Sequence, residues 1–134
     1  MQRVFPFAVF KFALAAALLF LTVQSAPAEI TKKAYIELWT RTCKMGATTH
    51  NISLPANELA IVKADLDNMH FLESVWYANY ETKKGFGMKL PAYPSWIEKK
   101  CRCAAEFIAP RKNKLGGPTS ADLVSKVSEQ CMAD

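Results

Sequence analysis

Four cysteines constrain this chain more than any other feature: Cys43, Cys101, Cys103 and Cys131. In an exported chain of this length, an even number of cysteines favours disulfide bridges over metal thiolates or free thiols. Within a helix, residues two positions apart point about 200° away from each other, so Cys101 and Cys103 cannot bridge to one another. Each must therefore pair with Cys43 or Cys131, and the spacing leaves open which takes which partner.

The disulfide interpretation depends on export, and residues 1–28 have the features of a secretory signal peptide. Their only charges are Arg3 and Lys11, and an uninterrupted apolar run follows over residues 12–21. The triplet Ala26-Pro27-Ala28 comes next and has the small-x-small pattern that signal peptidase uses. We therefore expect cleavage after residue 28.

An uncleaved membrane anchor is the alternative. Residues 4–23 form a window of 20 residues, which is about the length that spans a bilayer. Lys11 lies inside this window, and the apolar run beyond it has only about a dozen residues, which is signal length. The alanine-rich middle and the A-x-A ending favour a bacterial periplasm as the destination, and secretion is the other possibility.

Residues 29–134 predict one all-α domain of three or four helices, stapled by two disulfides. This part of the chain is the size of a single domain, and apolar residues recur in it at steps of three and four. No strand pattern competes. We expect helices over residues 31–45, 55–82 and 95–108, and a fourth that starts at residue 119.

Local signals predict the ends of these helices. Gly46 should end the first, because glycine takes the left-handed conformation that closes a helix. The second should bend, if anywhere, at Asp67-Asn68. Ser95 with Glu98, and Thr119 with Asp122, have capping-box spacing and should start the third and fourth.

The third helix should lie at the centre of the domain, because its sequence is apolar on two sides. Ile97, Cys101 and Ile108 belong to one apolar face, whereas Trp96 and Cys103 belong to another. We expect one bridge to clamp this helix to the first helix and the other to clamp it to the fourth.

Charge is distributed unevenly along the mature chain. Residues 83–114 carry a net charge of +7, whereas residues 29–82 and 115–134 each carry −2. Aromatic and apolar residues, among them Phe86 and Met88, accompany the positive charges. The predicted partner-binding residues are Lys83, Lys84, Lys89, Lys99, Lys100, Arg102, Arg111, Lys112 and Lys114.

This pattern favours a non-enzymatic binding protein of the cell envelope, such as an inhibitor or an immunity-type protein. A basic, aromatic-rimmed surface suits an acidic protein or an anionic envelope component, with membrane-surface contact as a possibility. Nucleic acid does not fit the predicted compartment. The alternative is that the lysines only keep a small domain in solution.

Two further functions stay open. Trp39, Trp76 and Trp96 could line a cavity for a small apolar ligand. Cys101-Arg102-Cys103 could be a redox pair, although a C-x-C inside a helix is a weak signal beside two further cysteines. We find no phosphate-binding loop, nucleophile elbow or H-E-x-x-H sequence, and we expect neither a cofactor nor a metal.

Asp67, His70 and Glu73 recur at steps of three on the second predicted helix. Such a group resembles a metal or general-base site. Two steps of three drift by about 120°, however, so the two carboxylates should lie on divergent sides of the histidine. We interpret the group as a solvated helix face, and His50 as a loop residue without a local partner.

Overall fold

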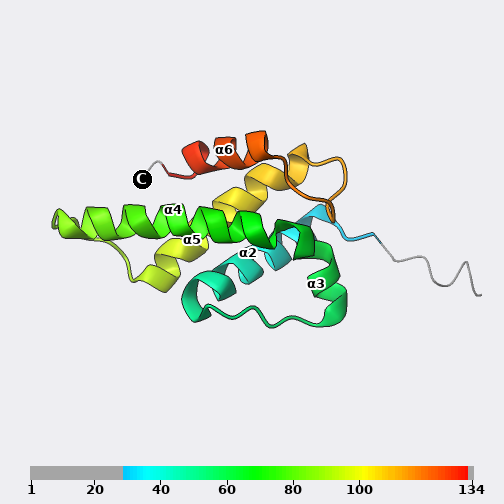
Figure 1. Cartoon of the computed structure of the whole chain (residues 1–134), viewed down its shortest axis with the longest axis horizontal. Helices are drawn as coiled ribbons and strands as arrows, with labels where there is room; N and C mark the ends of the chain where they lie inside the picture. The colour runs from blue at the N-terminus through cyan, green and yellow to red at the C-terminus, as the bar shows by residue number, and fades with distance from the viewer. Residues whose placement is uncertain (1–28, 133–134) are drawn as a thin grey trace, which may run out of the picture.

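A computed structural model of the chain describes residues 29–132, and within this range every regular element is a helix (Figure 1). The all-α prediction is therefore confirmed. The predicted signal peptide lies outside the described residues. The α-helices are α2 (Lys32–Thr49), α3 (Ala56–Val62), α4 (Leu66–Gly85), α5 (Tyr93–Ile108) and α6 (Ala121–Gln130), with 3-10 turns η1 (Lys63–Asp65) and η2 (Ala109–Arg111).

Helix α5 is the centre of the fold. It packs most extensively against α2 and also contacts α4 and α6, while the colour order in Figure 1 shows α6 returning along α4 after the long turn from α5. Trp39, Leu72, Trp76, Ile97 and Val127 are fully buried where these helices meet. Burying such side chains is the main favourable contribution to folding.

Two disulfides fasten α5 on both sides, as predicted. Cys43 of α2 bonds to Cys101, and Cys103 bonds to Cys131 at the end of α6. The structure thereby settles the pairing that the spacing left open. Two disulfides in so small a domain are typical of an oxidising compartment outside the cytosol. In residues 29–132, no helix combines the length and apolar character needed to cross a bilayer.

The first helix does not end at Gly46, so that prediction is wrong. Helix α2 continues to Thr49, and His50 takes the left-handed conformation with φ of 56° and donates its backbone N–H to the carbonyl of Gly46. Gly46 is instead buried beside Ile52 and Glu73. The absence of a side chain at residue 46 leaves room for Ile52 and Glu73, and the helix does not end there.

The second predicted helix is broken earlier than expected. The break is η1, which separates α3 from α4, and not Asp67-Asn68, which lie inside α4. Asp65, the last residue of η1, is buried. The turn thus coincides with a carboxylate that enters the core, a tertiary effect that local sequence does not reveal.

Both predicted capping boxes are wrong, although α5 ends at Ile108 as predicted. Helix α5 starts at Tyr93, before Ser95, and Glu98 pairs with Lys44 of α2 at 2.9 Å. The cap of α6 is Ser120, whose Oγ accepts from a backbone N–H. Thr119 instead binds the buried carboxylate of Asp65, which is why it does not cap α6.

Candidate functional site

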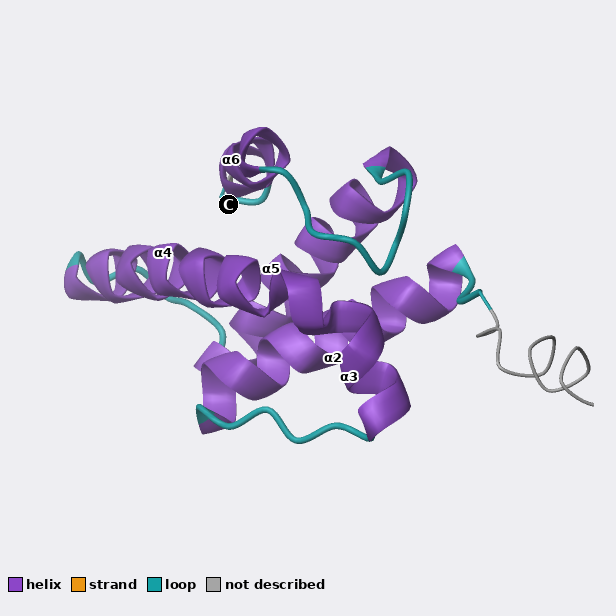
Figure 2. Ribbon diagram, turned by 45° about the vertical axis from the view of Figure 1, so that its right-hand side comes forward, coloured by secondary structure: helices purple, strands orange, loops and turns teal. Residues whose placement is uncertain are grey.

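Residues 83–89, which we name the α4 tip, bring three of the predicted basic residues together with two exposed apolar side chains. In both overall views, the end of α4 extends beyond the other helices (Figure 1 and Figure 2). Phe86 is 81% exposed and Met88 is 52% exposed. Among the described residues, the side chains of Lys83, Lys84 and Lys89 form neither an ion pair nor a hydrogen bond. The tip therefore presents positive charge and apolar surface together.

The backbone of the tip is held in a defined shape by its own hydrogen bonds. The N–H of Gly87 donates to the carbonyl of Lys84 at 3.0 Å, and the N–H of Met88 donates to that of Lys83 at 3.2 Å. This pair of bonds is the Schellman motif that closes many helices. Gly87 supplies its left-handed residue, with φ of 78°.

An aromatic cluster supports the base of the tip. Tyr80 contacts both Tyr93 and Trp96, with ring centroids 5.2 and 5.0 Å away, and its hydroxyl donates to the carbonyl of Pro91 at 2.8 Å. Tyr77 meets Tyr93 edge to face at 5.6 Å. Burial, together with the charge of Glu73, raises the pKa of Tyr93 to about 12. The ring contacts and the hydrogen bond to Pro91 anchor the chain that follows the tip against α4.

The other predicted basic residues do not join the tip in one patch. Lys99 and Lys114 are exposed. Residues 111–114, however, follow the far end of α5, and the 16 residues of this helix, about 24 Å in length, lie between them and the tip. Of the remaining side chains, Arg102 pairs with Glu37 at 2.8 Å, Arg111 lies over the ring of Phe107, and Lys100 is buried with its ammonium 5.2 Å from the ring of Trp96.

Lys112 lies in the interior, which contradicts its placement on an exposed binding surface. Its side chain is 4% exposed, and the ammonium lies 3.2 Å from the carboxylate of Asp65. It also donates to the carbonyls of Leu115, at 3.0 Å, and Gly117. A charged group is kept out of water only when it is paired, and Asp65 supplies the opposite charge.

Asp65 accepts hydrogen bonds from several parts of the chain. Tyr35 and Trp39 of α2 donate at 3.2 Å, and the N–H and hydroxyl of Thr119 donate at 2.8 and 2.7 Å. Burial by itself raises the pKa of Asp65, but the bonds from Thr119 and the charge of Lys112 outweigh it and hold the pKa below its usual value. This network is structural, and no sequence signal marked it.

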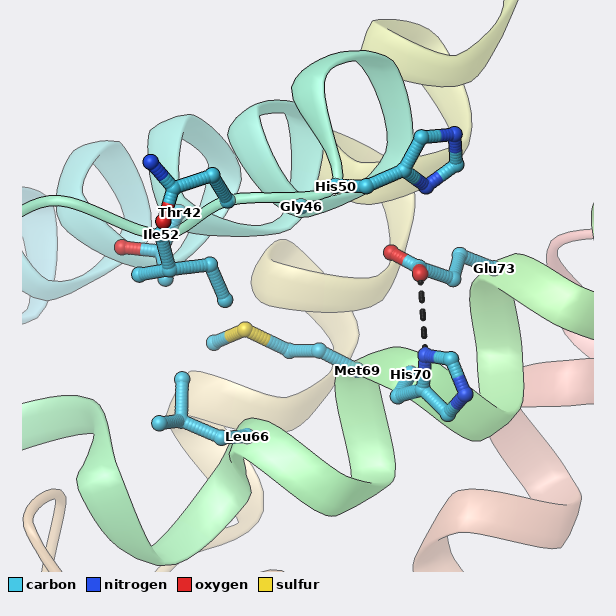
Figure 3. Close-up of a pocket in the computed structure, with 9 residues that line it drawn as sticks. Thr42, Gly46, His50, Ile52, Leu66, Met69, His70 and Glu73 are labelled. Atoms are coloured by element: carbon cyan, nitrogen blue, oxygen red, sulfur yellow. Dashed lines mark hydrogen bonds and ion pairs between the residues drawn. The ribbon is translucent and has the colours of Figure 1, made fainter.

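A groove between the end of α2 and the middle of α4 is the second candidate site (Figure 3). It consists of two adjoining cavities, of about 240 and 580 Å³, which share His50, His70 and Glu73. Figure 3 shows Glu73 between the two histidines, and the Nδ1 of His70 lies 3.1 Å from the Oε1 of Glu73. We name this site the Glu73 groove.

Asp67 and His70, the latter with a side chain that is 79% exposed, lie on a solvated helix face as predicted, and Glu73 is the exception. The side chain of Glu73 is only 13% exposed, whereas Asp67 is exposed and diverges from it as predicted. Burial raises the pKa of Glu73, and its contacts with His70 and the charge of His50 oppose this rise only in part. Sequence spacing found Glu73 and His70 but could not place His50 beside them.

Neither the three tryptophans nor the C-x-C cysteines, on which the two alternative functions depend, line the Glu73 groove. Trp39, Trp76 and Trp96 are buried in the core, and none of them lines the cavities of the Glu73 groove. Cys101 and Cys103 belong to different bridges, and no free cysteine exists in the part of the chain that the structure describes. Within that part, no three histidine, cysteine, aspartate or glutamate side chains are arranged to hold a metal ion.

Comparison of the chain with protein-family models, with curated proteins and with solved structures finds no match.

Proposed function

We propose that this protein is an exported, non-enzymatic binding protein of the cell envelope, in a bacterial periplasm, and that it uses the α4 tip to bind an acidic partner protein. An inhibitor or an immunity-type protein would bind an acidic partner through a basic surface of this kind. The single observation that supports the proposal is the combination at the tip of Lys83, Lys84 and Lys89 with exposed Phe86 and Met88.

Apolar exposure at the tip favours binding over mere solubility. Lysines keep a domain in solution whether or not an apolar side chain lies beside them. Phe86, however, is left almost entirely in water, which costs free energy. Aromatic residues and methionine are enriched at protein interfaces, where charges at the rim add steering and specificity. The tip has this composition.

The defined backbone of the tip is also favourable for association. Binding requires that loops and side chains lose conformational freedom, and a preformed surface lowers this cost. The Schellman motif at Gly87 and the bond from Tyr80 to the carbonyl of Pro91 hold the tip in place before any partner arrives. We therefore expect association without a large rearrangement.

Charge reversal at the tip tests the proposal. The triple variant Lys83→Glu, Lys84→Glu and Lys89→Glu should lose an acidic protein that the wild-type chain captures from the envelope fraction of its source. The captured proteins are identified by mass spectrometry at low and high salt, because exposed charge pairs weaken as salt rises. Circular dichroism checks that the variant is folded.

The matched control reverses three exposed lysines elsewhere, Lys32, Lys33 and Lys63, and produces the same change in net charge. It should capture the same acidic protein as the wild type. Equal capture by the tip variant would contradict the proposal. So would a preference of the wild type for vesicles of anionic phospholipid with no protein captured, which would make a lipid surface the partner instead.

A further inference from the structure

We propose that the Glu73 groove binds a small organic cation, a primary ammonium group carried on an aliphatic chain. This inference concerns a different site and ligand from those of the α4 tip, and it does not depend on the partner of the tip. It rests on a largely buried carboxylate that faces two cavities, in which apolar and aromatic residues stand beside polar ones.

The carboxylate of Glu73 lacks a permanent cation. Its Oε1 contacts the Nδ1 of His70 at 3.1 Å, whereas its Oε2 forms no hydrogen bond within residues 29–132 and stays accessible from the groove. No lysine or arginine lines either cavity. A carboxylate that is largely shielded from water and has neither a lysine nor an arginine beside it favours a ligand that brings a positive charge.

Gly46 gives the carboxylate its place against α2. A Cβ added at residue 46 would lie 3.3 Å from the Oε2 of Glu73, which is tighter than ordinary contact, and 3.4 Å from Ile52. The bare backbone of α2 thus leaves space for the oxygen at the wall of the smaller cavity. Across this space, Figure 3 shows His50 facing Glu73 from the end of α2.

The surroundings of the carboxylate match the two parts of an alkylammonium ion. Tyr77 and Tyr93 line the larger cavity, and aromatic rings attract ammonium groups through the negative charge of their faces. Ile52, Leu66 and Met69 line the smaller cavity and can cover an aliphatic chain. A cavity of about 580 Å³ falls in the size range of small-molecule sites.

An organic cation fits these residues better than the other ligand classes. An anion would meet the charge of Glu73 directly and would be repelled. His50, His70 and Glu73 share the groove, but they are not among any three side chains arranged to hold a metal in the described part of the chain. A neutral apolar ligand would bring no positive charge to the carboxylate.

Titration of the full exported chain with hexylammonium chloride tests the inference. Binding is followed by NMR, and hexan-1-ol is the neutral probe of similar length. We expect hexylammonium to bind roughly tenfold more tightly than hexan-1-ol, and Glu73→Gln to remove that preference. The control Glu81→Gln removes an exposed carboxylate from the same helix and should leave the preference unchanged.

The wild-type protein supplies a second measurement that needs no variant. Methyl signals of Ile52 and Met69 should shift on titration, whereas that of Leu123, which belongs to α6, should not. Absence of a saturable shift at the groove would overturn the inference, as would equal affinity for the alcohol. Either result would leave the capture experiment at the α4 tip untouched, so the two proposals fail separately.

Discussion

Asp65 is a single residue that ties together distant parts of the sequence. It accepts hydrogen bonds from Tyr35 and Trp39 in α2 and from Thr119 ahead of α6, and it pairs with Lys112. All of these groups reach the same carboxylate in the interior. Removing it would leave the Lys112 ammonium buried without its counter-charge, which is far more costly than losing one surface ion pair.

We expect Asp65→Ala to lower the free energy of unfolding by about 3–5 kcal/mol, because the variant leaves an unpaired buried cation. Asp67→Ala, two residues away and exposed, should change it by no more than about 0.5 kcal/mol. Urea unfolding followed by circular dichroism measures both. Similar small losses in the two variants would show that the network contributes little.

The same carboxylate should control stability in acid. Because the folded-state pKa of Asp65 lies below its unfolded value of about 3.9, its contribution is present above that value. The contribution is lost as the pH falls through the folded-state pKa. Urea unfolding between neutral pH and about pH 2 should therefore show a loss in the wild type that is smaller in Asp65→Asn.

Sequence indicated which residues are ionisable but not which of them are buried. Lys112 and Lys83 look alike in a basic segment, yet one is enclosed by Asp65 and two carbonyls whereas the other remains at the surface. Glu73 was likewise assigned to a solvated face. These outcomes depend on contacts with residues far away in the sequence, which periodicity and spacing do not encode.

Helices were predicted well as elements but poorly at their ends. The apolar steps of three and four located the helical regions, because the buried stripe is a property of the segment itself, but they joined α3 and α4 into one helix. The caps failed because the residues concerned have tertiary partners: Thr119 binds Asp65, and Glu98 binds Lys44. A capping signal indicates a hydrogen bond that a residue can form locally, whereas tertiary contacts determine which hydrogen bond it forms in the folded protein.

The shape of the α4 tip depends on Gly87, the left-handed residue of its Schellman motif. We expect Gly87→Ala to cost about 1 kcal/mol, since alanine is strained at positive φ, and to weaken binding at the tip. Gly85→Ala is the control. Residue 85 is helical and its added Cβ meets nothing within 4 Å, so this variant should be neutral or slightly stabilising.

Thermal unfolding and partner capture measure the two glycine variants side by side. Equal affinity of Gly87→Ala and Gly85→Ala for the partner would mean that the backbone shape of the tip does not matter for binding.

The whole molecule is a small helical frame in which α5 is fixed on both sides. Cys43–Cys101 joins it to α2 and Cys103–Cys131 joins it to the end of α6. This arrangement was predictable, because cysteines two apart in one helix must point to different neighbours. The projection of α4 beyond the frame was not, since it depends on where the chain turns back and on the aromatic contacts of Tyr80.

Rigid anchoring of α5 gives the molecule a stable body from which the tip extends. The disulfides restrict the unfolded chain, and the core encloses three tryptophans. The tip leaves Met88 and, to the greatest extent among the large apolar side chains of the described residues, Phe86 in water. Most of the domain thus supports α4, whose end is the proposed binding surface.

Site-specific photo-crosslinking in the cells of origin tests the proposed function of the α4 tip most directly. A photo-reactive amino acid is placed at Phe86 of the α4 tip or, as the control, at Phe71, which is 53% exposed on the same helix. We predict a covalent adduct with one acidic envelope protein from position 86, lost when Lys83, Lys84 and Lys89 are changed to glutamate. Adducts that form equally from position 71, or that survive the charge reversal, would contradict it.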